Sequence, residues 1–212
     1  MPAADEATRS LVDALRRPAA YPEPPGEVEL IETHISAVFL AGSYAYKIKK
    51  PVDLGFLDFS SLARREHFCR EELRLNRRLA PSLYLDVVAV TQGPDGPRFG
   101  GEGPTLEWAV KRRRFAQAAQ LDRQLEAGLV TTEDMDAVAA HIAAFHDAAT
   151  VAPGDRPWGT AAAVAAPVDA NFATLQPALA DTSLAPALAR LADWSDQRAL
   201  SLIHISEPTR QV

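Results

Sequence analysis

Lysine is scarce in this sequence of 212 residues. Its 22 lysine and arginine residues include only four lysines, so that almost every cation is an arginine. Three of the four, Lys47, Lys49 and Lys50, fall within one short segment. A compact ammonium and a forked guanidinium are not interchangeable. The cluster therefore predicts a site that needs ammonium groups.

Other absences exclude whole classes of protein. The one cysteine, Cys69, excludes an intrachain disulfide. No apolar run approaches the roughly 20 residues that span a bilayer, and an N-terminus with Asp5 and Glu6 lacks the apolar core of a secretory signal. A net charge of −6 argues against the broad cationic surface that nucleic acids and anionic membranes require. We expect a cytoplasmic protein with no nucleic-acid and no membrane partner.

Short apolar segments alternate with turns between residues 27 and 115. Their period-two patterns predict strands. An apolar stripe at helical spacing, capped by Ser60 or Ser61 and closed by Pro81, predicts a helix over residues 61–79. The Gly- and Pro-rich residues 92–103 are expected to form a loop. The sequence thus predicts an α+β region with one helix and five antiparallel strands, at 27–32, 37–40, 44–49, 83–90 and 105–115.

Helices are expected on both sides of this region. Residues 1–26 predict a short helix over 7–17 and a proline-rich linker. Residues 116–199 predict a helical region, in which one helix, from Thr131 or Thr132 to about Ala149, buries Met135, Val138, Ile142 and Phe145. The Ala-rich segment 161–200 is expected to form two or three helices, punctuated by Pro167, Pro177 and Pro186.

A lysine and a glutamate stand out as candidate binding residues. On a strand, Ala45, Lys47 and Lys49 share one face; Ala45 leaves room for a flat base, and the Lys47 ammonium can reach phosphates. Glu72 lies on the apolar stripe of the following helix, where a carboxylate needs a partner. We expect a Lys47–Glu72 ion pair, with Glu71 as the alternative partner. A purely structural strand of surface lysines is the competing interpretation.

Three segments resemble one family of enzymes. They are Glu32-Thr33-His34-Ile35-Ser36, Tyr46-Lys47-Ile48-Lys49-Lys50-Pro51-Val52-Asp53-Leu54-Gly55-Phe56-Leu57-Asp58 and Glu72-Leu73-Arg74-Leu75-Asn76-Arg77-Arg78-Leu79-Ala80-Pro81, with weaker support from 109–111, 145–146 and 171–172. Over residues 20–199 the chain resembles the aminoglycoside-phosphotransferase-like kinases. It is most similar to the kinase-like half of bacterial proteins that also carry a P-loop ATP-binding domain.

The resemblance implies a protein-kinase-like fold, with an N-lobe at 27–115 and an incomplete helical C-lobe at 116–199. It implies binding of ATP, with Mg²⁺ in the full-length protein, and phosphoryl transfer to a small-molecule acceptor. Lys47, held in place by Glu72, would contact the phosphates, and Ser36 would lie in the hairpin above them. Arg112 and Arg113 would belong to the hinge that meets adenine through backbone groups. A fused P-loop domain is the implied partner.

The residues that would carry out phosphoryl transfer are not found in this sequence. The fold needs a catalytic-loop Asp, an Asn five residues later and a metal-binding Asp; His146-Asp147 lacks this spacing, and Asp53 and Asp58 precede the helix of Glu72. Residues 200–212 form an expected non-native tail, because 200–210 resemble a translated sequencing adapter. We expect the missing groups beyond residue 199 and no catalysis by this fragment. The alternatives are a non-catalytic nucleotide-binding or regulatory module, or a scaffold.

Overall fold

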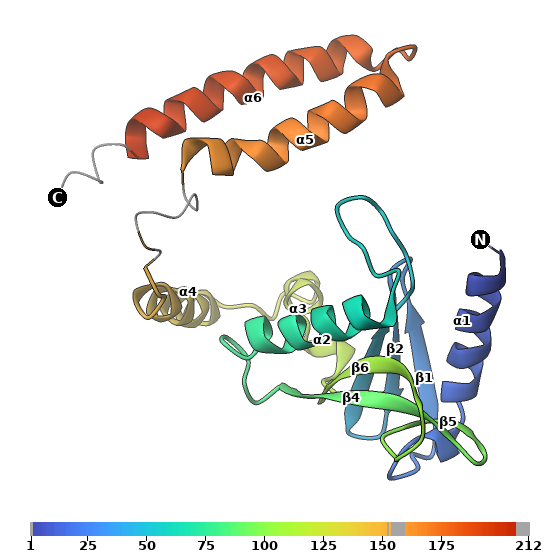
Figure 1. Ribbon diagram of the computed structural model, residues 1–212. Coiled ribbons are helices and arrows are strands. Elements are labelled where there is room, and N and C mark those ends of the chain that lie inside the picture. Colours follow the sequence, from blue (N-terminus) through green and yellow to red (C-terminus); the bar gives the residue numbers. More distant parts are fainter. Residues whose placement is uncertain (1, 152, 154–159, 207–212) are drawn as a thin grey trace. The chain divides into compact units, whose positions relative to one another are not determined.

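The computed structural model describes residues 2–151, 153 and 160–206. The chain divides into two compact units, Met1–Ala148 and Ala149–Val212. In the described residues the first unit holds a mixed sheet-and-helix fold, and the second holds two helices (Figure 1). The predicted α+β class, with an antiparallel sheet, is confirmed.

The sheet of the first unit has six strands rather than the expected five, in the order β1-β2-β3-β6-β4-β5 (Figure 1). All neighbouring strands run antiparallel. The additional strand is β5, inside the expected loop 92–103. It forms because Gly93 pairs with Gly96, and the positive φ of Gly96 lets the chain reverse between them. The strands are β1 Val28–Glu32, β2 Ser36–Ala41, β3 Tyr44–Lys49, β4 Tyr84–Gly93, β5 Gly96–Phe99 and β6 Thr105–Arg113.

One face of the sheet, here called the α1 face, carries the main core. Helix α1 (Pro2–Leu15) and the 3-10 turn η1 (Pro18–Ala20) pack on it, where the expected proline-rich linker begins. The Tyr21 hydroxyl donates to the carbonyl of Leu15 at 2.9 Å and so satisfies an end group of α1. The buried side chains of this core are Val12, Leu15, Ala20, Tyr21, Ala37, Phe39, Ala41, Tyr46, Ile48, Val90, Phe99 and Ala109.

The opposite face, here called the α2 face, is covered in part by helix α2 (Leu62–Asn76) (Figure 1). The Ser61 hydroxyl caps this helix by accepting from the Arg64 N–H. A buried ion pair fastens its first turn to β6, with Arg65 Nε 2.7 Å from Glu107 Oε2. Further along, Cys69 packs against Val87 and Val110. These contacts fix the rotation of α2, and with it the direction of each of its side chains.

Helix α2 ends at Asn76, three residues before the predicted end at 79. The Arg77 side chain donates to the carbonyls of Tyr84 and Leu85. These bonds tie the end of the helix to the start of β4. The chain therefore turns before the proline that was expected to stop it.

The rest of the first unit is helical, as predicted, but its apolar residues are not buried as predicted. It contains η2 (Gln117–Ala119), α3 (Leu121–Glu126) and α4 (Thr132–Asp147). A capping box between Thr131 and Asp134 begins α4. Phe145 is half-buried beneath the Arg78 guanidinium, 4.5 Å away, whereas the expected core residues Met135, Val138 and Ile142 are exposed.

The second unit contains α5 (Ala161–Leu179) and α6 (Ala185–Ser206). These two helices agree with the predicted two or three, although Pro167 and Pro177 lie inside α5 and do not separate helices. Alanine has the highest helix propensity, and Thr160 caps α5 through the Ala163 N–H. Pro186 is the second residue of α6, where a proline removes no helical hydrogen bond. No helix among the described residues combines the length and apolar character needed to cross a lipid bilayer.

We expect the unpredicted strand β5 to be essential to the core. Phe99 is 1% exposed and its ring contacts those of Tyr21, Phe39 and Tyr46. Phe99→Ala should lower the free energy of unfolding by about 3–5 kcal/mol, measured by urea denaturation. Phe56→Ala is the matched control, because that ring is 88% exposed; it should change stability by less than about 0.5 kcal/mol. Equal effects would contradict this account.

Candidate functional site

The α2 face is organised in cross-strand rows. Because residues directly opposite each other in an antiparallel pair point to the same face, the register defines which side chains are neighbours. One row runs through Glu29, Leu40, Ala45, Arg112 and Tyr84. The next row runs through Ile31, Val38, Lys47, Val110 and Val87. A third row pairs Ser36 with Lys49.

The expected ion pair between Lys47 and Glu72 is formed. Lys47 Nζ lies 3.0 Å from Glu72 Oε1 and 3.2 Å from Oε2. Lys49 Nζ lies 2.7 Å from Glu72 Oε2, so the carboxylate has two ammonium partners. The Lys49 side chain is 7% exposed and Glu72 16%, whereas Lys47 keeps 28% of its surface open. Lys47 is therefore the ammonium that a ligand can reach.

This Lys47–Glu72–Lys49 triad carries a surplus of positive charge. Two ammonium groups face one carboxylate, which leaves one positive charge at a partly desolvated position, where electrostatic attraction is stronger than in water. Burial alone would raise the pKa of Glu72, but the attraction and hydrogen bonds of Lys49 and Lys47 outweigh it and lower that pKa below its ordinary value. Glu72 is therefore ionised at neutral pH, and the site as a whole favours anions.

The alternative partner, Glu71, faces away from the lysines. Its carboxylate accepts three hydrogen bonds from Arg74 on the exposed side of α2, one of them at 2.7 Å. The hydrogen bonds of Arg74, together with its charge, lower the pKa of Glu71. The choice left open by the sequence is thus decided in favour of Glu72.

The predicted site residues Ala45 and Ser36 have different neighbours in the structure. Ala45 is buried and packs with Val38 and Leu40 into a small apolar cluster beside Lys47. Ser36 is also buried, but its hydroxyl lies 3.0 Å from Thr33 Oγ1, and its N–H donates to the same oxygen. Ser36 thus stabilises the β1–β2 turn, and its hydroxyl is not presented to a ligand.

The expected hinge residues are already engaged through their backbone. The Arg113 N–H donates to the Leu83 carbonyl and the Arg114 N–H to the Ser43 carbonyl, both at 2.9 Å. The N–H groups of Arg113 and Arg114 are thus used within the sheet, and the hinge role of Arg112 and Arg113 stays a prediction. The Arg112 side chain instead lies on the α2 face beside Ala45, and Arg113 donates from its exposed side chain to the Ser82 carbonyl.

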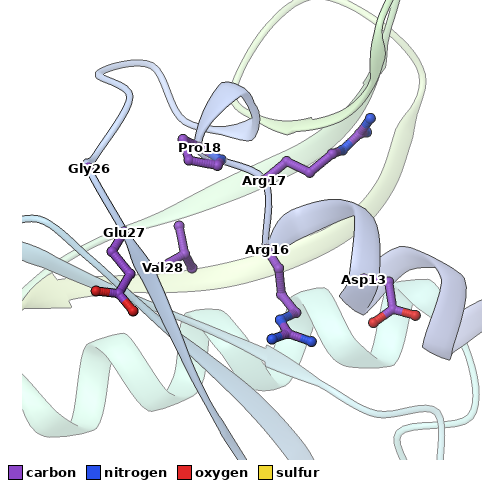
Figure 2. A pocket seen from close by; sticks show the side chains of 7 residues that line it. All are labelled: Asp13, Arg16, Arg17, Pro18, Gly26, Glu27 and Val28. Carbon is purple, nitrogen blue, oxygen red and sulfur yellow. The ribbon is translucent and has the colours of Figure 1, made fainter.

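An open hollow of about 480 Å³ lies away from these residues, at the end of α1 (Figure 2). Asp13, Arg16 and Arg17 line it from the α1 side, and Glu27 from the start of β1. Its two carboxylates and two guanidinium groups balance in charge. The hollow therefore lacks the charge surplus of the triad, and we do not assign the function to it.

Two further residue groups have structural roles. The carboxylates of Asp53 and Asp58 accept hydrogen bonds from residues two positions later, Gly55 and Ser60, and so shape the connection from β3 to α2. His141 contacts the Leu79 carbonyl at 3.2 Å. Among the described residues, no group of three or more His, Cys, Asp or Glu side chains could hold a metal ion.

Sequence reasoning missed Lys49 as the second partner of Glu72. The signal was present, since Lys47 and Lys49 are two apart on one strand and so reach the same carboxylate. It also missed the Arg65–Glu107 pair, which joins residues 42 positions apart and leaves no local pattern.

The chain is similar to three uncharacterized proteins, one from Mycobacterium bovis and two from strains of Mycobacterium tuberculosis. Each is 36% identical over 122 residues, which is 58% of this chain and 23% of the relative. The chain thus spans less than a quarter of the length of the curated relatives it matches. No family model matches the chain, and no solved structure matches it.

We predict that Glu72→Gln destabilises the protein in a pH-dependent way. Near neutral pH it should cost about 3 kcal/mol, because it leaves two partly buried ammonium groups without a counter-charge. The folded-state pKa of Glu72 lies below its ordinary value of 4.5, so its contribution is complete above pH 4.5 and is lost as the pH falls through the lowered pKa. The stability difference from wild type, measured by urea denaturation, should shrink over that range.

Glu71→Gln is the matched control, one residue away on the exposed side of α2. It removes the same charge but only a solvent-exposed pair, and such pairs contribute little. It should leave the urea midpoint nearly unchanged at neutral pH. If Glu71→Gln lowered the urea midpoint as much as Glu72→Gln, the triad would contribute no more to stability than a solvent-exposed ion pair.

Proposed function

We propose that the first unit binds the phosphates of a nucleoside triphosphate, ATP by the resemblance, through the Lys47 ammonium. One observation carries the proposal: Glu72 holds Lys47 in place but, because Lys49 shares that carboxylate, does not neutralise the site. The Lys47 ammonium is held in position and partly shielded from water, but part of its surface stays accessible. It can therefore bind a phosphate group through a charge-assisted hydrogen bond. The apolar cluster of Val38, Leu40 and Ala45 provides a floor beside it.

The order of elements supports a kinase-like assignment. Protein kinases place their phosphate-binding Lys on the third strand and pair it with a Glu of the following helix. Here Lys47 lies on β3, and Glu72 lies on α2, the next helix. We therefore propose a kinase-like N-lobe at residues 27–115, with the helices after β6 as part of a C-lobe.

The full-length protein would transfer a phosphoryl group to a small-molecule acceptor, with a P-loop domain fused to the same chain. Among the described residues no group of three or more His, Cys, Asp or Glu side chains could hold a metal ion, so the ligands of Mg²⁺ are proposed to lie in the remainder of the full-length protein. No catalytic residue is assigned in this chain. The role proposed for its own residues is to bind and orient the triphosphate.

A second candidate function is a non-catalytic nucleotide-binding or regulatory module. Both functions require the same phosphate contact at Lys47. They differ in whether residues beyond this chain supply a general base, which single-turnover hydrolysis and transfer assays on the full-length protein would measure.

Lys47→Ala should weaken binding of inorganic tripolyphosphate and of an imido analogue of ATP by about tenfold or more in calorimetry, because a charge-assisted hydrogen bond is lost. The fold should persist, since Glu72 retains Lys49. Lys111→Ala is the matched control. Lys111 is in the neighbouring strand but on the α1 face, over the Tyr44 ring at 4.1 Å, and its loss should change affinity less than about twofold. Equal losses in both variants would refute a local phosphate site.

A further inference from the structure

We propose that the side chain of Arg112 makes the nucleotide site selective for guanine over adenine. This inference rests on the proposed phosphate site, and it replaces adenine, the base implied by the resemblance, with guanine. It concerns a residue of the α2 face that the phosphate site does not use.

Arg112 lies where a base would meet the sheet. It is directly opposite Ala45 across the β3–β6 pair, and Lys47 is two residues along β3 on the same face. Successive residues on one face of a strand are about 7 Å apart. A nucleotide whose phosphates contact Lys47 can therefore extend its base along this face, with one edge toward Arg112.

The Arg112 guanidinium has an unused hydrogen-bond donor. Its Nε is fully buried and finds no acceptor among the described residues. The Phe115 ring lies 5.6 Å from its central carbon, which restricts the guanidinium without accepting a conventional hydrogen bond. A buried donor without a partner is unfavourable, so an acceptor supplied by a ligand would be a favourable addition.

The neighbouring carboxylates on this face are already committed. Glu72 accepts from Lys47 and Lys49, and Glu29, in the same row as Arg112, pairs with Arg114 at 3.1 Å. Lys47 and Lys49 share one counter-ion, Glu72. Arg112 is a third cation on this face, and it has no carboxylate partner among the described residues. The acceptor that suits it must come with the bound molecule.

Guanine and adenine differ at the edge that an arginine reads. Guanine presents two acceptors, O6 and N7, which match the forked donors of a guanidinium, whereas adenine presents N7 beside the N6 amino group, which is a donor. Beside Arg112, adenine would oppose donor to donor, while guanine would satisfy the fork. A lysine here could not make the same paired contact.

The test is equilibrium binding to the full chain, with three probes in the same Mg²⁺ buffer: the imido analogue of GTP, that of ATP, and inorganic tripolyphosphate. We expect the GTP analogue to bind at least about tenfold more tightly than the ATP analogue. Arg112→Met should abolish this preference and leave tripolyphosphate affinity within about twofold. Arg112→Lys, which keeps the charge without the fork, should abolish it too.

Arg98→Met is the control, because Arg98 is exposed on β5 at the far edge of the sheet and should retain the preference. A wild-type protein that binds tripolyphosphate and both analogues equally, or prefers the ATP analogue, overturns the role of Arg112 alone. A protein that binds none of the three probes overturns the proposed function and this inference with it. Thermal melts establish that each variant is folded, and Arg112→Lys decides the question if Arg112→Met is not.

Discussion

The site depends on one carboxylate that lies between two ammonium groups. Lys47 and Lys49 point to the same face of β3, and without Glu72 they would repel each other in a partly desolvated space. Glu72 reaches them because α2 is held at a fixed rotation by the Arg65–Glu107 pair and by Cys69 packing on Val87 and Val110. The position of the Lys47 ammonium therefore depends on the packing of α2. The surplus positive charge arises because two lysines share one carboxylate.

The two faces of the sheet carry different kinds of side chain. The α1 face holds an aromatic cluster, with Tyr21, Tyr46 and Phe99 in mutual contact. The α2 face carries Lys47, Lys49 and Arg112 beside a small apolar floor. Because β3 alternates strictly between these faces, one strand serves both. Substitutions at even and odd positions of β3 therefore act on different properties of the molecule.

The parts of the fold with a strong local pattern could be predicted from the sequence. The alternation along β3 and the stripe of α2 were sufficient to pair Lys47 with Glu72, because each pattern fixes a direction and the two directions converge. The strand β5 was missed because its Gly and Pro residues indicate a loop equally well, and only pairing with β4 distinguishes the two. The Ala-rich segment was predicted to form two or three helices, and it forms two, with Pro167 inside the first.

The site was predictable only in part, because some of its properties arise from contacts distant in sequence. Arg112 was expected to act through its backbone; the place of its side chain beside Ala45 follows from the β3–β6 register, which no local pattern reveals. Met135 and Ile142 were predicted to be buried but are exposed, and this too depends on contacts that the local pattern does not reveal. Their spacing indicates an apolar face on α4, but spacing alone cannot say what covers it.

The triad also has a consequence for how the sheet assembles. A shift of β3 by one residue would carry every side chain of the strand to the opposite face, so both ammonium groups would enter the aromatic core while Tyr46 and Ile48 met Glu72. Misaligned pairings are therefore penalised twice, by buried charge and by lost packing. The same lysines that favour an anionic ligand therefore also disfavour the wrong register of β3 during folding.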